Sequence, residues 1–183
     1  MILMDCKKQN VYADLLIENA AELITMAPNV SGENPKGPRV GSDMRTLSII
    51  PDGSIAIFNG RIVDIGKTCE VKKKVKLMPD GKLINAKGKV VLPGFVDCHT
   101  HLIFAGSRES EFIQRAEGKT YLEILESGGG ILSTVKSTRN ATFSELLDIG
   151  LKNLDVMLSH GTTTVEIKSG YGLSIEEELK ALR

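Results

Sequence analysis

The stretch LPGFVDCHTH, residues 92–101, decides the fold prediction. It joins an apolar run to two histidines, His99 and His101, whose i, i+2 spacing places them on one face of a β-strand. In parallel α/β folds, catalytic groups gather at the C-terminal ends of strands. Two neutral imidazoles at this spacing can share one divalent metal ion. The simpler alternative is a pair of polar residues that ends a strand without a ligand.

The sequence that follows alternates between helix and strand patterns. Residues 142–160 carry apolar residues at helical spacing. Thr142 and Glu145 form a capping-box pattern at the start of this segment, and Gly161 marks its end. The β-branched run TTTVEIKS, residues 162–169, predicts a strand. Strand, helix and strand in this order indicate parallel βαβ units.

A second helix start lies near the end of the chain. Ser174 and Glu177 form another capping-box pattern, and Leu179 and Leu182 share one face of the predicted helix. No Gly, Asn or Pro follows Leu182 before Arg183, the last residue. We therefore expect the chain to be a fragment of a longer protein.

The sequence before residue 93 predicts a small antiparallel β domain. Asn59-Gly60 is a two-residue hairpin signal between the strands SIAIF and RIVDI. Pro-Asp-Gly triplets at 51–53 and 79–81 predict two further turns. The other expected features are strands at 12–19 and 21–26, an exposed loop at 28–45, and a solvated basic strand or turn at Lys72–Lys74 with Lys76.

Composition excludes several classes of function. Lys+Arg and Asp+Glu both number 23, so there is no net charge to attract nucleic acid or an anionic membrane. The N-terminal apolar run is too short for a signal peptide, and no stretch approaches the ~18 apolar residues of a membrane span. The three cysteines are odd in number and widely spaced, which indicates a reducing compartment, the cytoplasm.

Several segments together resemble one known family. LPGFVDCHTH resembles the first barrel strand of the amidohydrolase superfamily, and HLIFAGSRESEF, YLEILESGGGILSTV and MLSHGTTTVEIKSGYGLSIEEELKALR are similar to the imidazolonepropionases within it. The resemblance implies an α/β fold, with a (β/α)8 TIM-type barrel beside a β-sandwich built from both chain ends. Residues 1–92 would then be part of the β-sandwich domain, and residues 93–183 the first βα units of a partial barrel.

The resemblance also implies roles for individual residues. His99 and His101 match the first two ligands of one divalent metal, zinc or iron, and the remaining ligands would lie beyond residue 183. Arg108 matches the arginine that holds the substrate's propionate, and the alternative is a surface ion pair with Glu109 or Glu111. Tyr171 matches a substrate-contacting tyrosine, and the alternative is a packing aromatic in a Gly-rich loop.

Structural roles are expected for four other polar side chains. His160 ends a predicted helix, where the helix dipole favours a histidine. A capping role is therefore expected for His160 rather than a role as a metal ligand. Glu166 and Lys168 share one face of their strand, which predicts an interior ion pair rather than a carbamylated metal-bridging lysine. Cys98 points away from the two histidines and is expected to be a buried small hydrophobe.

The reaction implied by the resemblance is hydrolysis of the cyclic amide of 4-imidazolone-5-propanoate to N-formimidoyl-L-glutamate, in histidine degradation. A metal would lower the pKa of a water for this step. The alternatives are another amidohydrolase acting on cyclic amides, and a fragment that is inactive without its missing half. The family also implies a homodimer with a small-molecule substrate and no nucleic-acid or membrane partner.

Overall fold

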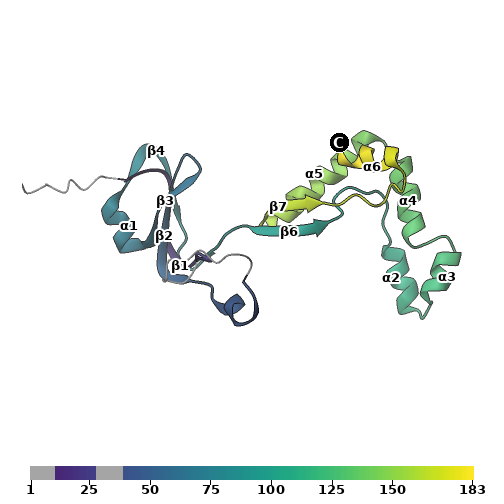
Figure 1. The fold of residues 1–183 in the computed structure, drawn as a ribbon, viewed down its shortest axis with the longest axis horizontal. Coiled ribbons are helices and arrows are strands. Elements are labelled where there is room, and N and C mark those ends of the chain that lie inside the picture. Colours follow the sequence, from purple (N-terminus) through teal and green to yellow (C-terminus); the bar gives the residue numbers. More distant parts are fainter. Residues whose placement is uncertain (1–10, 28–38) are drawn as a thin grey trace, which may run out of the picture. The chain divides into compact units, whose positions relative to one another are not determined.

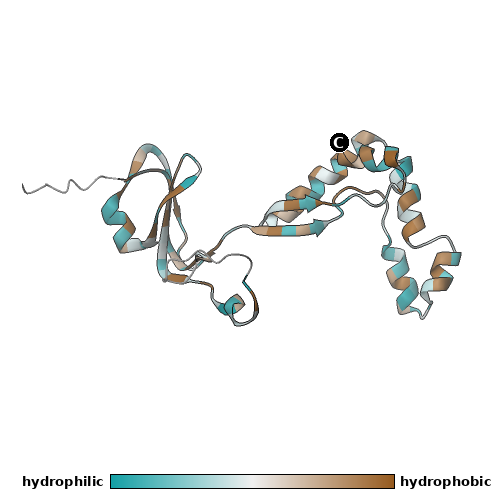
Figure 2. Ribbon diagram, viewed as in Figure 1, coloured by the Kyte–Doolittle hydropathy of each residue, from teal (hydrophilic) through white to brown (hydrophobic). Residues whose placement is uncertain are grey.

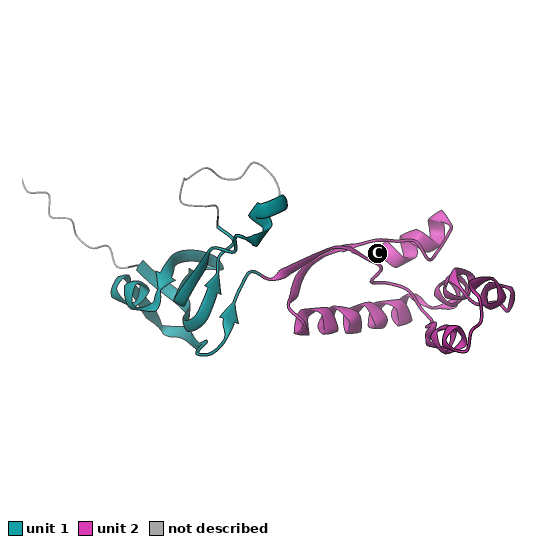
Figure 3. Cartoon of the chain, turned by 90° about the horizontal axis from the view of Figure 1, so that it is seen from below, with its two compact units in different colours: residues 1–93 teal, residues 94–183 magenta. Residues whose placement is uncertain are grey.

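The computed structural model describes residues 11–27 and 39–183. The chain divides into two compact units, Met1–Pro93 and Gly94–Arg183 (Figure 3). The expected loop at 28–45 lies partly outside the described residues, and its end forms a short 3-10 helix, η1 (Gly41–Arg45). No helix among the described residues combines the length and apolar character needed to cross a membrane.

The first unit is built on a mixed β-sheet (Figure 1). Its strands have the order β3-β2-β1-β4, and β5 also pairs with β1. The elements are β1 (Val11–Ile24), β2 (Ile49–Phe58), β3 (Arg61–Lys67), α1 (Thr68–Lys74), β4 (Val75–Asn85) and β5 (Val90–Val91). The expected strands at 12–19 and 21–26 are one continuous strand, β1. The antiparallel prediction holds for β1–β2 and β2–β3 but is wrong for β4 and β5, which run parallel to β1.

The helix α1 explains the parallel pairing. It follows β3 and returns the chain so that β4 runs in the direction of β1, a connection that a hairpin cannot make. Lys72, Lys73 and Lys74 are exposed, as expected, but they lie on α1 and not on a strand or turn. Val71, on the same helix, packs with Ala13, Leu16, Ala56 and Val75 in the core of this unit.

Local turn chemistry sets the hairpin of this sheet. Asn59 and Gly60 have φ values of +50° and +69°, which suit a type I′ turn, and Phe58 pairs with Arg61 across it. The Pro-Asp-Gly triplet at 51–53 is not a separate turn, because it lies within β2, with Asp52 at φ +48°. The register with β1 jumps from Leu77 to Lys82, so the second triplet, at 79–81, is not a separate turn either but an irregularity within β4.

The second unit contains the predicted parallel βαβ arrangement. The strands β6 (Phe95–Thr100) and β7 (Thr162–Ile167) pair in parallel. The backbone N–H of Lys168 donates to the carbonyl of Thr100 over 2.8 Å, so the two C-terminal ends lie side by side. The helices are α2 (Glu109–Ala116), α3 (Tyr121–Glu126), α4 (Ile131–Asn140), α5 (Phe143–Ser159) and α6 (Ile175–Leu182).

The longest helix, α5, forms as its sequence predicts. The Thr142 hydroxyl accepts from the Glu145 backbone N–H, and the Glu145 carboxylate accepts from the Thr142 N–H, which completes the capping box. Apolar and hydrophilic residues alternate along the helix (Figure 2). Leu146 is 2% exposed, whereas Leu147 is 47% exposed, so one face is packed and the other is not. The cap at Ser174 of α6 forms only in part, through its hydroxyl and the Glu177 N–H.

The apolar run that leads into the histidines is more exposed than its sequence suggests. Phe95 and Val96 are 55% and 67% exposed, and Cys98, expected to be buried, is also exposed. Within the described part of the chain, β6 pairs only with β7, so neighbours that would cover these side chains are lacking. A two-stranded pair is not a closed barrel, and the partial TIM barrel and the β-sandwich therefore stay predictions.

Candidate active site

Two imidazoles lie together at the C-terminal end of β6. His99 is the next-to-last residue of the strand and His101 follows the strand directly. Their ring centroids are 5.8 Å apart, with the ring planes inclined at 65°. The His99 backbone N–H donates to the Asp97 carboxylate over 3.0 Å, which fixes the backbone between them. This geometry suits a shared ligand, although their role as metal ligands stays a prediction.

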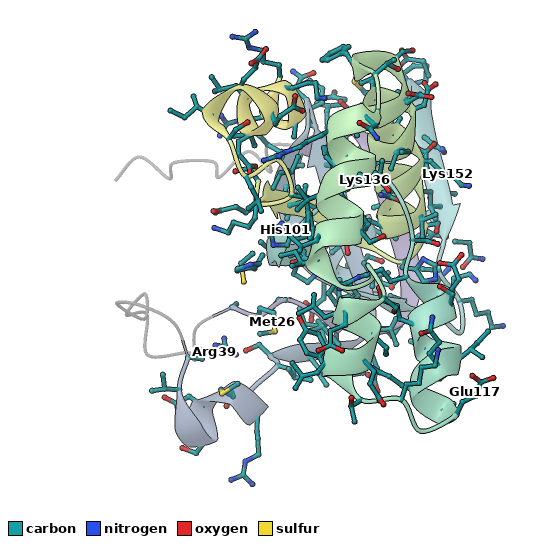
Figure 4. The ribbon with its side chains drawn as sticks, turned by 90° about the vertical axis from the view of Figure 1, so that its right-hand side faces the viewer. Met26, Arg39, His101, Glu117, Lys136 and Lys152 are labelled. Carbon is teal, nitrogen blue, oxygen red and sulfur yellow. The ribbon has the colours of Figure 1, made fainter. Side chains whose placement is uncertain are left out.

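His101 is enclosed by the loop after β7. Its Nδ1 is buried and has no hydrogen-bond partner among the residues that the structure describes. The Tyr171 ring lies against it, with centroids 5.0 Å apart, and Phe104 packs on Tyr171 at 5.2 Å. Figure 4 shows His101 beside the yellow C-terminal segment. A Cβ atom at Gly170 would lie 3.0 Å from the His101 Cε1, so the close approach of this loop requires a glycine.

Arg108 and Tyr171 meet at one cavity, although they are distant in sequence. The cavity has a volume of about 290 Å³ and is lined by Phe104, Gly106, Ser107, Arg108, Thr134 and Tyr171. The lining thus includes a guanidinium and hydroxyl groups, which suit a carboxylate. Tyr171 connects the cavity to His101, because it lines the cavity and its ring lies against the imidazole.

The carboxylates near Arg108 are engaged elsewhere. Among the described residues Arg108 forms no salt bridge. The Glu111 carboxylate accepts from the Gly130 N–H over 2.6 Å. The Ser107 hydroxyl donates to Glu109, and this hydrogen bond holds the pKa of that carboxyl below its usual value. Within the described ranges, the guanidinium thus has no carboxylate partner and is available to an external anion.

Glu166 and Lys168 form the expected ion pair on β7. The pKa of Glu166 lies below its usual value, chiefly through the hydrogen bond and charge of Lys168, with a smaller effect of His99. The pair is not interior, because the Glu166 side chain is 62% exposed. It lies on the strand that neighbours the two histidines.

His160 lies at the end of α5, as predicted. It is the C-cap residue, and its Nδ1 is 2.8 Å from the carbonyl oxygen of Val156. Two further residues that line the cavity, Ser107 and Thr134, were not predicted from the sequence. Ser107 was detectable as the neighbour of Arg108 in a polar loop, whereas nothing in the sequence distinguishes Thr134 from other helix residues.

The donor set at this end of the sheet is incomplete for a metal. The described residues contain no group of three or more His, Cys, Asp or Glu side chains placed to hold an ion. The unpartnered Nδ1 of His101 and the adjacent ring of His99 nevertheless fit two positions of a larger ligand set.

Comparison with known proteins identifies close relatives of the sequence. Residues 82–181 match the model of the amidohydrolase family. The chain is 52% identical over 170 residues to the imidazolonepropionase of Symbiobacterium thermophilum, covering 93% of the chain and 38% of the relative. It is 49% identical over 172 residues to that of Thermoanaerobacter pseudethanolicus, again covering 93% and 38%. The chain thus spans less than half the length of the curated relatives it matches.

Solved structures share the fold at low sequence identity. An adenosine deaminase from Xanthomonas campestris with bound zinc superposes with a TM-score of 0.58 at 18% identity, covering 87% of the chain and 29% of the deaminase. The guanine deaminase of E. coli gives a TM-score of 0.56 at 20% identity, covering 91% and 33%.

Proposed function

Because the chain belongs to the amidohydrolase family, we propose that it is part of an imidazolonepropionase. The reaction is the hydrolysis of 4-imidazolone-5-propanoate to N-formimidoyl-L-glutamate. Relatives of that name, about half identical over most of the chain, support this substrate. The same proposal includes a cytoplasmic location, assembly as a homodimer, and no nucleic-acid or membrane partner.

The cavity between Arg108 and Tyr171 is the observation that carries the proposal. Arg108 binds the propionate through its two-pronged guanidinium, which matches a carboxylate. Tyr171 contacts the substrate between the carboxylate and His101, since its ring lies 5.0 Å from the imidazole. The imidazolone ring is thereby directed toward the two histidines.

His99 and His101 would supply two ligands of one divalent metal, zinc or iron. The buried, unpartnered Nδ1 and the neighbouring imidazole support this assignment, as does the zinc in the related deaminase. When bound, such a metal lowers the pKa of a water and polarises a carbonyl oxygen.

The chain's own residues contribute to the reaction through binding and positioning. Water adds its oxygen to the ring carbonyl carbon, the bond from that carbon to the ring nitrogen breaks, and the nitrogen takes a proton. Arg108 and Tyr171 hold the substrate at its carboxylate end, which fixes the carbonyl relative to the histidines and lowers the barrier by positioning. Phe104 packs on Tyr171 and gives the same cavity an apolar wall.

The test is turnover by the full-length protein that contains this chain. The purified protein, supplied with zinc or iron, should consume 4-imidazolone-5-propanoate and release N-formimidoyl-L-glutamate. His101→Ala should abolish turnover and lower metal content, whereas His160→Ala, at the helix end, should leave both intact. Hydrolysis of a different cyclic amide, with no turnover of this substrate, would identify another amidohydrolase and refute the proposal.

A further inference from the structure

The turn that carries Tyr171 is held by a carboxylate that does not line the cavity. The Glu178 Oε1 atom, on α6, accepts from the backbone N–H of Gly172 over 3.0 Å and from that of Leu173 over 2.7 Å. Charge-assisted hydrogen bonds of this kind are about twice as strong as neutral ones. Both donors directly follow Tyr171.

The other side of the same turn is fixed by a second helix. The Arg139 Nε, on α4, donates to the Gly172 carbonyl over 2.7 Å. Gly172 is buried, and a Cβ atom there would lie 2.7 Å from the backbone N of Glu178, so the turn packs tightly on α6. Leu173 has a φ of +55°, a conformation that a leucine rarely adopts, and its N–H bond to Glu178 offsets this strain.

The charge state of Glu178 agrees with a role in holding the turn at 172–173. Burial alone would raise the pKa of Glu178, but the hydrogen bonds it accepts from the turn, led by the Leu173 N–H, outweigh that effect. Its pKa therefore lies below the usual value, and the group is an anion at neutral pH. Glu176, two residues earlier on α6, is exposed and forms no comparable bond among the described residues.

We propose that Glu178 is a positioning residue that fixes the Tyr171 ring between His101 and the Arg108 cavity. Its carboxylate, with Arg139 on the opposite side, sets the backbone at 172–173 and hence the place of Tyr171. Only the expected kinetic effect of Glu178 depends on the proposed function. The contacts from Glu178 to the turn and from Tyr171 to His101 stand independently of the substrate.

The kinetic test uses the full-length protein. Glu178→Ala should raise KM and lower kcat/KM by about tenfold, while metal content stays constant. This loss is smaller than that for a direct bond to the substrate, because Glu178 acts only through the position of Tyr171. Glu178→Gln keeps an acceptor oxygen and should recover most of the loss. Glu176→Ala, the matched control on the same helix, should behave as wild type. In a Tyr171→Ala background, Glu178→Ala should lower kcat/KM only slightly further, because Glu178 acts through Tyr171.

Two measurements independent of turnover complete the test. In Glu178→Ala, amide hydrogen exchange should accelerate at Gly172 and Leu173, and Tyr171 should react faster with tetranitromethane. Unchanged exchange and nitration, or a full kinetic loss in the Tyr171→Ala background, would overturn the proposal. If the wild-type protein does not hydrolyse 4-imidazolone-5-propanoate, the proposed function fails, and exchange and nitration alone decide whether Glu178 holds this turn.

Discussion

Replacing Arg108 by lysine separates charge from geometry at the cavity. Lysine keeps the positive charge but loses the planar fork that pairs with both carboxylate oxygens. Arg108 has no salt-bridge partner among the described residues, so the substitution releases no protein carboxylate that could offset the loss. The change is therefore equivalent to removing one charge-assisted hydrogen bond to the substrate.

Such a bond contributes about 2–3 kcal/mol. We expect kcat/KM for 4-imidazolone-5-propanoate to fall by about 30- to 160-fold, since each ~1.4 kcal/mol changes a rate tenfold. The assay is steady-state hydrolysis by the full-length protein with its metal content measured, and that content should not change. Arg115→Lys is the matched control, because Arg115 lies on α2, the helix that begins directly after Arg108, over the ring of Tyr121, and does not line the cavity.

A second substrate makes the prediction specific to the carboxylate. An imidazolone whose side chain ends in an amide should be hydrolysed more slowly by the wild-type protein, and Arg108→Lys should add only a small further loss. Unaltered kinetics in the lysine variant, or equal losses with both substrates, would show that Arg108 does not bind the propionate.

Three further predictions concern stability and metal binding. Leu146→Ala should lower the free energy of unfolding by about 2–5 kcal/mol in denaturant titrations, and Leu147→Ala by clearly less, because the two side chains are 2% and 47% exposed; equal costs would contradict the packing of α5. The pKa of Glu145 is lowered first by the Thr142 N–H and then by its hydroxyl, so the cap stabilises α5 above the unfolded pKa of about 4.3 and loses that effect as pH falls through the lower folded pKa. The midpoint of thermal unfolding should therefore be lower in Glu145→Ala than in wild type at pH 7, with the difference shrinking below pH about 4; a constant difference would exclude the cap. The 183-residue chain by itself should not turn over the substrate with added zinc or iron, because its described residues offer no three-ligand group, and metal-dependent turnover by the pure chain would disprove this.

The features that sequence predicted well are those that neighbouring residues determine. The Asn59-Gly60 turn needs only two residues that tolerate positive φ. The capping box of α5 needs only Thr142 and Glu145, three positions apart. The parallel pairing of β6 with β7 follows from one strand, helix and strand pattern. Each of these requires no knowledge of distant parts of the chain.

The errors lie where distant segments decide the outcome. An apolar run is consistent with burial, but Phe95 and Val96 are exposed because the described residues provide no neighbours for that part of β6. The antiparallel prediction for the first unit assumed that successive strands form hairpins, whereas α1 interposes a crossover before β4. Pro-Asp-Gly at 51–53 has turn chemistry, and yet pairing with β1 keeps it within β2.

The site shows the same division between local and distant information. The spacing of His99 and His101 predicted two imidazoles at a strand end, and the structure places them there. Sequence alone could not place Arg108 beside Tyr171, nor identify Thr134 and Glu178, because loops and helices that are distant in sequence bring these residues together. Resemblance supplied roles for Arg108 and Tyr171, but only the structure shows that they share a cavity.

The described residues also divide the chemistry of the site into two parts. The cavity proposed to hold the carboxylate is formed within the second unit, by α4 and the loops that follow β6 and β7. The metal position has only the two imidazoles, because the described residues contain no larger donor group. Under the proposed function, we therefore expect substrate anchoring to depend on Arg108 and Tyr171, and metal binding to need ligands in addition to His99 and His101. Substitutions at Arg108 or Glu178 should consequently change KM at constant metal content, and substitutions at His99 or His101 should change both together.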